Sequence, residues 1–439
     1  MNPIVLYVDP LWRRKGVHSP IMQPWWRNPY EKISLFSWEM FDAYSYDTSY
    51  YILTDDIQKA DMVFAPYRHN WFLRFDRKLL WECIRTAQAH KLPLLVDGLA
   101  DIEFPIGEKN VFILRCSGYR FQTEPGRIQI PLATDDLLER TRGGQLSIRK
   151  KVEGKPVIGF AAWTKISFKH RLRSFIKEIL VRLRSIFDSR YQACRKGILW
   201  RQKIINILRK SPLITLNLRE RSSFSANPKT AEWDMKQLRE EMVETILQSD
   251  YALDVRGDGN NSARLFEILS LGRIPVILDT ERNFPFKDKI DYSSFSLIVD
   301  FRDAHRLPAI VAEFHKNISP ERYEEMQRNA RNAFVKYFRI DAVARHIFEK
   351  VPKMRRQLEV VMKSSSLEVT YDEQLLQLSV MVLTDTIQCP WPAPVYLFSE
   401  TTDAISQFEK GAELLKSGRA SEIWILDDVN QTNTGYAGA

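Results

Sequence analysis

The sequence predicts an α/β protein with two layers built on parallel sheets and a further segment after them. Short apolar runs with strand character recur along the chain, helical stretches separate them, and one segment joins a strand, a turn, a helix and a second strand. Strands that alternate with helices form parallel sheets. Because 439 residues are too many for one ordinary core, we expect domains at 1–150 and 151–350 and a tail at 351–439.

The segment 249–286 organises the rest of this prediction. A short apolar run at 251–255 is expected to be a strand, and the polar, glycine-bearing residues 256–261 after it predict a turn. We call residues 256–261 the glycine turn. Ser262 or Asn261 then caps a helix, and a second buried strand follows the helix.

Ligands in such layers bind outside the carboxyl ends of the strands, at the N-termini of the helices. Here that place runs from Gly257 to Arg264. Backbone N–H groups at a helix N-terminus favour an anion, and the guanidinium of Arg264 suits phosphate oxygens. Glu267 lies three residues on, on the same helical face, where its carboxylate can accept hydrogen bonds from a ribose. The pattern indicates a nucleotide or nucleotide-sugar site, and an ordinary surface pair of Arg264 and Glu267 is the alternative.

Two stretches of the sequence resemble the exostosin family of glycosyltransferases. One is R-G-D-G-N-N-S-A-R-L-F-E-I-L-S-L-G-R-I-P-V-I-L, which starts at Arg256 and is followed by F-P-F; the other, at 54–67, has acidic residues, then A-D, an apolar strand and P-Y. The two stretches stand in the same order as in the family, and the resemblance covers about residues 40–340. Arg273 stands where a cysteine is common in the family and Tyr292 where a tryptophan is common. These departures concern the donor and acceptor rather than the fold.

The resemblance implies a GT-B architecture, in which two Rossmann-like domains face each other across a cleft, here with an extra C-terminal βαβ tail. It also implies an inverting transferase that needs no metal and no cofactor, because helix dipoles and basic side chains offset the charge of the leaving diphosphate. In the family an arginine after the first strand of the second domain faces the donor, and Arg173 or Arg171 is the nearest match. The donor-binding residues that we predict are Arg256, Gly257, Asn261, Ser262, Arg264, Glu267 and Arg173.

The catalytic base is predicted from the ends of strands in the first domain. Asp97 follows the apolar run Leu94-Leu95-Val96, and His69 lies in the loop after the strand near 62–66. An inverting transfer needs one group that takes the proton from the attacking hydroxyl, and Asp, Glu or His can do this. We rank Asp97 first, His69 second and Asp9 third. A capping or core role is the alternative for each of them.

The segment 165–210 is strongly basic. It carries 14 Lys and Arg residues against Glu178 and Asp188, with apolar residues at helical spacing. Such a pair of helices suits an anionic membrane surface or a nucleic acid, or is a solvated basic face over a buried stripe. The protein has no zinc, RNP or helix-turn-helix pattern, so we expect no nucleic acid as partner. Peripheral membrane contact stays open.

Composition and cysteine usage indicate a globular protein of a reducing compartment. Apolar residues make up 44% and aromatic residues 12%, and the net charge is +9. The four cysteines are widely spaced and form no C-x-x-C pair. With no leader-like start and no apolar run long enough for a membrane span, we expect a cytoplasmic protein, with peripheral contact to the inner face of the membrane as an addition. The aromatic residues crowded into the first fifty positions are either an acceptor platform or core.

The tail is predicted to hold one βαβ unit, with strands at 395–399 and 421–428 around a helix at 401–417. Its role is left open. For the whole chain we predict a hexosyl- or pentosyltransferase that moves a sugar from a nucleotide-sugar to a saccharide or lipid-linked acceptor in polysaccharide synthesis. The alternative is a non-catalytic exostosin-like protein that binds a glycan or an anionic membrane surface.

Overall fold

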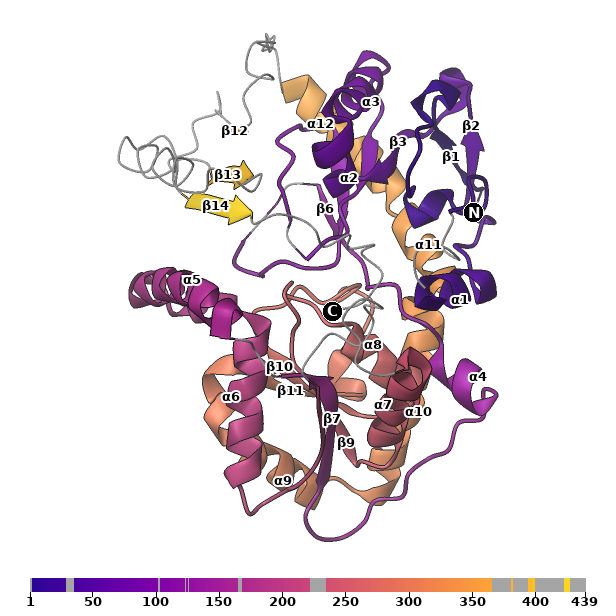
Figure 1. Cartoon of the computed structure of the whole chain (residues 1–439). Coiled ribbons are helices and arrows are strands. Elements are labelled where there is room, and N and C mark those ends of the chain that lie inside the picture. The colour runs from indigo at the N-terminus through magenta and orange to yellow at the C-terminus, as the bar shows by residue number, and fades with distance from the viewer. Residues whose placement is uncertain are drawn as a thin grey trace. The chain divides into compact units, whose positions relative to one another are not determined.

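The structure is a computed structural model, and Figure 1 shows the whole chain. It describes residues 2–28, 35–101, 103–122, 124, 126–164, 168–221, 234–364, 380–381, 394–398 and 422–426. Side chains are outside the description at residues 35–36, 168–177 and 359–364 and in the three last strands. The chain divides into two compact units, Met1–Met362 and Lys363–Thr434.

The first sheet of the larger unit has six strands in the order β2-β1-β3-β4-β5-β6, and every neighbouring pair is parallel. Short apolar runs of the sequence near 4–8, 62–66, 92–96 and 111–114 form β1, β3, β4 and β5, and β2 and β6 complete the sheet. Every residue of β3, β4 and β5 is buried, as expected for a parallel sheet covered on both faces. The bounds are β1 Ile4–Tyr7, β2 Tyr51–Thr54, β3 Met62–Arg68, β4 Leu94–Asp97, β5 Val111–Arg115 and β6 Arg127–Gln129.

The second sheet of this unit has five parallel strands in the order β11-β10-β9-β7-β8. The two strands around the glycine turn, β9 and β10, lie side by side near its centre, and β10 is fully buried. The predicted α/β fold with two Rossmann-like layers is therefore confirmed. The bounds are β7 Val157–Trp163, β8 Thr215–Arg221, β9 Tyr251–Asp254, β10 Pro275–Asp279 and β11 Leu297–Asp300.

α-Helices connect β1 to β2, β3 to β4, β7 to β8, β8 to β9 and β9 to β10, which is the usual connection between parallel strands. The α-helices are α1 Leu35–Ala43, α2 His69–Phe75, α3 Arg77–Ala89, α4 Leu137–Arg142, α5 Phe168–Phe187, α6 Gly197–Lys210, α7 Met235–Leu247, α8 Ala263–Ser270, α9 Leu307–Asn317, α10 Pro320–Ala333, α11 Ile340–Phe348 and α12 Val351–Ser364. Short turns of helix occur at η1 Pro10–Trp12, η2 Pro20–Met22, η4 Ile57–Lys59, η5 Ser189–Cys194, η6 Tyr292–Ser294, η7 Phe301–Arg306 and η8 Phe334–Phe338. Among the described helices, none is long and apolar enough to cross a membrane.

The last helices of the larger unit return to the first sheet. Buried residues of α11 and α12 belong to the same apolar core as strands β1 and β3. The ring of Phe348 stacks on that of Tyr51 with centroids 4.5 Å apart, and Arg355 pairs with Asp61 at 2.8 Å. The first layer is thus completed by residues 340–358, beyond the 1–150 segment, while the domain limits 1–150, 151–350 and 351–439 stay a prediction.

The smaller unit contains the three strands β12 Val380–Met381, β13 Pro394–Phe398 and β14 Glu422–Leu426. Strands β13 and β14 pair in parallel, and β12 is antiparallel to β13. The two predicted strands of the βαβ tail are therefore present and parallel. The helix predicted at 401–417 lies outside the described residues.

Candidate functional site

The glycine turn lies at the carboxyl edge of the second sheet, between the end of β9 and the start of α8. Helix α8 begins after Ser262, whose extended φ of −157° is typical of an N-cap residue. The polar side chains of Arg256, Asn260, Asn261 and Ser262 are all buried. A turn that buries polar side chains requires partners for them, either in the protein or in a ligand.

Arg256 holds the glycine turn in shape. Its guanidinium donates to the carbonyl oxygens of Asp258 at 2.8 Å, Gly259 at 3.2 Å and Ala193 at 3.0 Å, and to the hydroxyl of Tyr119. Most of its donors are therefore engaged by protein atoms. The structure gives this predicted donor-binding residue a supporting position, and direct contact with a donor stays a prediction.

The loop after β5 contacts the glycine turn from the first layer. The backbone N–H of Asn260 donates to Ser117 Oγ at 2.6 Å, and the side-chain amide of Asn260 donates to Gly118 O at 3.1 Å. The amide of Asn261 donates to Cys116 Sγ at 3.1 Å. These bonds join two segments about 140 residues apart in sequence, and the sequence patterns alone did not reveal them.

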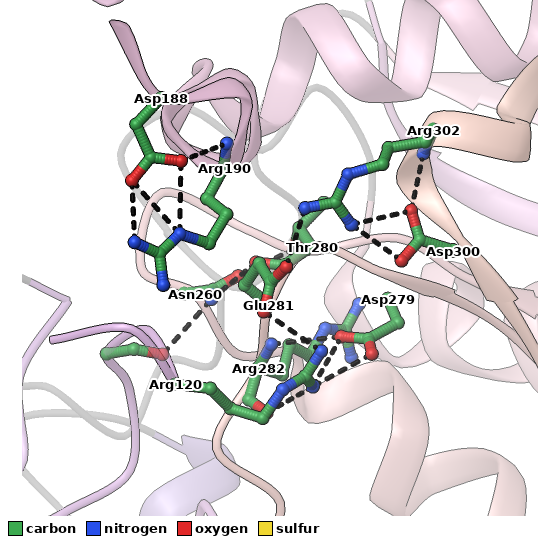
Figure 2. A network of polar contacts seen from close by, with 11 residues as sticks. Arg120, Asp188, Arg190, Asn260, Asp279, Thr280, Glu281, Arg282, Asp300 and Arg302 are labelled. Carbon is green, nitrogen blue, oxygen red and sulfur yellow. Dashed lines mark hydrogen bonds and ion pairs between the residues drawn. The ribbon is translucent and has the colours of Figure 1, made fainter. Parts of the chain in front are cut away.

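An ion-pair network continues this contact between the layers, as Figure 2 shows. Arg120, from the loop after β5, reaches Asp279 Oδ2 at 2.8 Å and Glu281 Oε2 at 3.1 Å, at the end of β10. Glu281 also pairs with Arg302 at 3.0 Å. Asn260 joins the same region through the hydroxyl of Thr280, 2.6 Å from its Oδ1. The network fixes the carboxyl ends of β9 and β10 beside the first layer.

The N-terminus of α6 approaches the glycine turn from the other direction. A Cβ added at Gly197 would lie 1.9 Å from Gly257 O and 2.7 Å from Arg256 O. Only glycine permits backbone contact this close. The start of α6 is therefore built against the glycine turn, and this places the next turn of α6, with Arg201, beside the site.

Arg264 and Glu267 face each other on α8, as their spacing predicts. Arg264 Nη1 lies 3.1 Å from Glu267 Oε2, and Nη2 donates to Ala161 O of β7 at 2.7 Å. Their side chains are 17% and 23% exposed. This is neither a free surface pair nor a closed core pair, because both side chains keep atoms accessible near the carboxyl end of β7.

Several buried polar atoms around the start of α8 have no hydrogen-bond partner among the described residues. They are Asn261 Oδ1, Ser262 Oγ, Asp254 Oδ1 and Arg201 Nε. Arg201 is 8% exposed, no described carboxylate pairs with it, and its one bond is a long contact of 3.4 Å to Trp163 O. Burial lowers the pKa of Arg201 to about 10, so the group is still charged at neutral pH. A buried cation with one weak hydrogen bond among the described residues, within electrostatic range of Arg256 and Arg264, is suited to an anionic ligand.

Asp101 supplies a carboxylate on the first-layer side. It lies four residues after the end of β4, accepts a hydrogen bond from the backbone N–H of Gly259, and is partly exposed. Its Cα is 3.1 Å from the position that a Cβ on Gly259 would occupy. Burial, together with the negative charge of Asp258, raises the pKa of Asp101 to about 6, although Arg256 and Arg201 oppose the shift. Asp101 is thus a carboxylate of raised basicity at the glycine turn.

The base candidates chosen from the sequence lie deeper in the first layer. Asp97 is 1% exposed; it accepts from Ser19 Oγ at 2.7 Å and from the Leu99 N–H at 3.0 Å. His69 is 3% exposed, and burial, with the charge of Arg115, lowers its pKa to about 3. None of the contacts found for either side chain involves the glycine turn. A catalytic role for Asp97 or His69 stays a prediction, and their partners indicate that they support the layer.

The remaining candidates divide in the same way. Asp9 caps η1 by accepting from the Leu11 N–H at 2.8 Å, which is the capping alternative stated for it. Arg173 lies on α5, and its side chain is outside the description. The sequence did not single out Arg201 or Asp101. A signal for Asp101 was available in the run Asp97-Gly98-Leu99-Ala100-Asp101, because a second carboxylate follows the same strand end.

A cavity of about 420 Å³ lies elsewhere, along the edge strand β8 and the end of α6. Leu208, Ile214, Asn217 and Glu220 are among the residues that line it, and none of its lining residues belongs to the glycine turn or to α8. We therefore place the candidate site by its chemistry, the unpaired polar atoms and charges at the start of α8, and not by this cavity.

The comparison with protein families matches the Exostosin GT47 domain to residues 200–314, which includes Arg201, the glycine turn and the Arg264–Glu267 pair. The Exostosin-1 homolog of Caenorhabditis elegans is 31% identical over 118 residues, which are 26% of this chain and 30% of that protein. The probable arabinosyltransferase ARAD1 of Arabidopsis thaliana is 24% identical over 216 residues, 48% of this chain and 44% of that protein. The chain spans less than half the length of these relatives.

Among solved structures, a glycosyltransferase from Rickettsia africae ESF-5 is similar over 70% of this chain and 78% of its own, with 12% identity and a TM-score of 0.34. Anabaena Alr3699/HepE in complex with UDP-glucose covers 83% of this chain and 100% of its own, with 11% identity and a TM-score of 0.32. The two parallel sheets and the site between strand ends and helix N-terminus define an α/β protein of the Rossmann-like class. In sequence, the part of the chain that carries the glycine turn and α8 is similar to the Exostosin GT47 domain.

Proposed function

We propose that this protein transfers a sugar from a nucleotide-sugar donor to a saccharide or lipid-linked acceptor in glycan synthesis. The observation that carries the proposal is Arg201, a buried cation that forms no ion pair with a described carboxylate and lies within electrostatic range of Arg256 and Arg264. Asn261 Oδ1 and Ser262 Oγ, which lie between these two arginines in sequence, also have no partner among the described residues. The stability of the fold gains nothing from an unpaired buried charge. A diphosphate would pair with it.

The donor would bind at the start of α8. Free backbone N–H groups of the first helical turn and the guanidinium of Arg201 supply positive potential for the two phosphates. Arg264 can turn its accessible side toward the same phosphates, and Glu267 can accept hydrogen bonds from the ribose hydroxyls. These residues would provide contacts for the phosphates and the ribose of a nucleoside diphosphate.

We further propose that the transfer is inverting and independent of a metal ion. The positive charges of Arg201 and Arg264 and the dipole of α8 support this, because they can offset the charge that develops on the leaving diphosphate. In the proposed step the acceptor oxygen forms a bond to the anomeric carbon while the bond from that carbon to the phosphate oxygen breaks. The hydroxyl proton passes to a carboxylate, for which we propose Asp101.

Asp101 suits the role of base better than the two residues chosen from the sequence. It lies at the glycine turn, it is partly exposed, and a carboxyl group with a pKa of about 6 is ionised at neutral pH while it still accepts a proton readily. Asp97 already accepts hydrogen bonds from Ser19 and Leu99. The acceptor would therefore approach from the loops of the first layer, and the basic segment 165–210 supports peripheral contact with an anionic membrane.

The proposal is tested by thermal unfolding and calorimetry with UDP, GDP, ADP and their common sugar conjugates. We expect one nucleotide to stabilise the protein selectively and Glu267→Ala to remove that stabilisation. Glu325→Ala is the matched control, because Glu325 also pairs with an arginine three residues away, but on the exposed face of α10. If a well-folded protein responds to none of these compounds, the donor site is refuted and the non-catalytic alternative stands.

A further inference from the structure

Helix α5 distributes its apolar and charged side chains in the opposite way from an ordinary surface helix. It follows β7 and leads through η5 into α6, and in Figure 1 it extends beyond the helices that cover the second sheet. On its inner side Glu178 is buried and pairs with Arg195 of the segment before α6 at 2.8 Å. A surface helix normally turns its apolar face inward, whereas this one places a carboxylate there.

All apolar side chains of the described part of α5 except Val181 point outward. Ile179 is 41% exposed and Leu183 52%, and the exposure rises to 75% at Ile186 and 92% at Phe187. With about 3.6 residues per turn, these four residues and Leu180 fall within an arc of about 120°. We call residues 179, 180, 183, 186 and 187 the outward arc. Contiguous exposed apolar surface of this kind marks a contact site.

Positive charge borders the outward arc on both sides. Arg182 and Arg184 lie about 40° beyond its two edges on the helical projection, and Arg182 is exposed. The helix sequence has six Lys and Arg residues and one acid, Glu178, which the pair with Arg195 occupies. An apolar arc between basic borders is the pattern of a helix that lies in the interface of an anionic bilayer.

We propose that the outward arc of α5 docks this protein on an anionic membrane surface, with Ile186 and Phe187 among the acyl chains and Arg182 and Arg184 at the lipid phosphates. A second copy of the chain suits the arc less well than a membrane does, because two such arcs would bring their positively charged borders together. Anionic lipid offers both the apolar phase and the counter-charge that the arc requires.

The docking would act close to the proposed donor site. The ring of Tyr191 in η5 lies under the guanidinium of Arg184, and Ala193 of the same turn accepts a hydrogen bond from Arg256. The helix is therefore linked through η5 to the glycine turn. In one respect the docking rests on the proposed function. If the site transfers a sugar, the substrate class that it would meet at the membrane is a lipid-linked acceptor embedded there.

The test uses the full chain and sedimentation with lipid vesicles. Wild-type protein is mixed with vesicles of neutral phospholipid and with vesicles that contain about one part in four of anionic phospholipid. We expect binding to the anionic vesicles at least about tenfold stronger than to the neutral ones, weakened by salt. The double variant Ile186→Ser/Phe187→Ser should lose about tenfold of that binding.

The matched control is Leu11→Ser/Phe75→Ser, which removes two apolar side chains that are 79% and 62% exposed on the first layer. We expect the control to bind vesicles like the wild type and both double variants to unfold at the wild-type temperature. Equal loss in both double variants, or no preference of the wild type for anionic vesicles, would refute the proposal. A wild-type dimer that dissociates in Ile186→Ser/Phe187→Ser would assign the arc to a protein contact instead.

Nucleotide binding by the same variants separates this inference from the proposed function. Because Ile186 and Phe187 are 75% and 92% exposed on the outer side of α5, the double variant should keep the nucleotide response of the wild type. Vesicle binding without any nucleotide response would leave the docking surface standing and refute the donor site. The reverse result would refute the docking surface alone.

Discussion

The residues of the glycine turn before Asn261 differ from those that follow it. Residues 256–260 are held by protein: Arg256 donates to backbone carbonyls, and Asn260 bonds Ser117, Gly118 and Thr280. From Asn261 to the first turn of α8, and at Arg201 beside it, buried polar atoms lack partners. The first part, residues 256–260, holds the turn in shape, and the second has the properties of a binding site, although one short segment contains both.

The contrast between these two parts shows why buried polarity alone does not identify a site. Arg256 and Arg201 are both nearly inaccessible, at 3% and 8% exposure, and both are arginines near the same turn. Their partners distinguish them. Arg256 donates to several backbone carbonyls, whereas Arg201 makes a long contact of 3.4 Å to Trp163 O and its Nε has no partner among the described residues. Substitutions should therefore affect folding in one part and binding or rate in the other.

The largest effect is expected from Asp101→Asn. If Asp101 takes the proton from the acceptor, its loss should reduce the transfer rate by about 10²–10⁴-fold while nucleotide affinity stays within a factor of about two. Initial rates of nucleoside diphosphate release measure the first quantity and calorimetry the second. Equal loss of rate and of nucleotide affinity would show that Asp101 shapes the site and is not the base.

A stability measurement accompanies this variant, because Asp101 has a raised pKa in the folded state. Between about pH 4 and pH 6 the folded protein binds more protons at Asp101 than the unfolded chain does, so the free energy of unfolding falls as pH rises through this range. An asparagine at this position does not ionise, so the variant Asp101→Asn does not lose this free energy of unfolding. We expect Asp101→Asn to be more stable than the wild type at pH 8 and equal to it at pH 4, as urea unfolding at both pH values will show.

The next effect concerns residues 256–260, which hold the turn in shape. Arg256→Ala leaves the carbonyl groups of Asp258, Gly259 and Ala193 without their donor, and we expect a loss of about 3–5 kcal/mol in the free energy of unfolding. Arg219→Ala is the control, since the one hydrogen bond of its guanidinium to a described residue goes to the neighbouring carbonyl of Leu218 on the exposed edge strand. Similar unfolding curves for the two variants would contradict the structural role of Arg256.

Arg201→Leu should give the opposite pattern. Removing a buried charge without a partner leaves the free energy of unfolding unchanged or raises it by about 1 kcal/mol, whereas nucleotide binding should weaken by about 1.5–3 kcal/mol. Lys203→Leu removes a charge from the exposed side of the same helix and should change neither quantity. A variant Arg201→Leu that binds nucleotide like the wild type would refute the anion site.

Local patterns predicted much of this architecture, and they did so where the physical cause is local. The strands β1, β3, β4, β7, β9 and β10 are short apolar runs bounded by turn residues, and the pairing of Arg264 with Glu267 follows from helical spacing. The helices α11 and α12 show the limit of this method. Their apolar periodicity indicates a buried face, but it does not say that the first sheet, some 290 residues earlier, is what covers it.

The site was predicted in part for the same reason. Residues 256–267 are contiguous, so the sequence shows them together. The strand, turn and helix start that place Asn261, Ser262, Arg264 and Glu267 are confirmed, and their binding of a donor stays a prediction. Arg201 and Asp101 come from other strand and helix ends, and only the fold brings them to the turn. Asp97 was preferred to Asp101 because it ends the strand directly, yet that position points its carboxylate to Ser19 and Leu99 within the layer.

The smallest expected effect tests the electrostatics of the binding part. Asp258 is exposed, and its negative charge raises the pKa of Asp101, so Asp258→Asn should lower that pKa. Because transfer requires ionised Asp101, the rate of the wild type should rise with pH to a plateau, with its midpoint at about 6. In Asp258→Asn the midpoint should move to lower pH by less than about one unit, with little change in the plateau rate. A shift to higher pH would mean that the titrating base is not Asp101, since no carboxylate becomes harder to ionise when a neighbouring negative charge is removed.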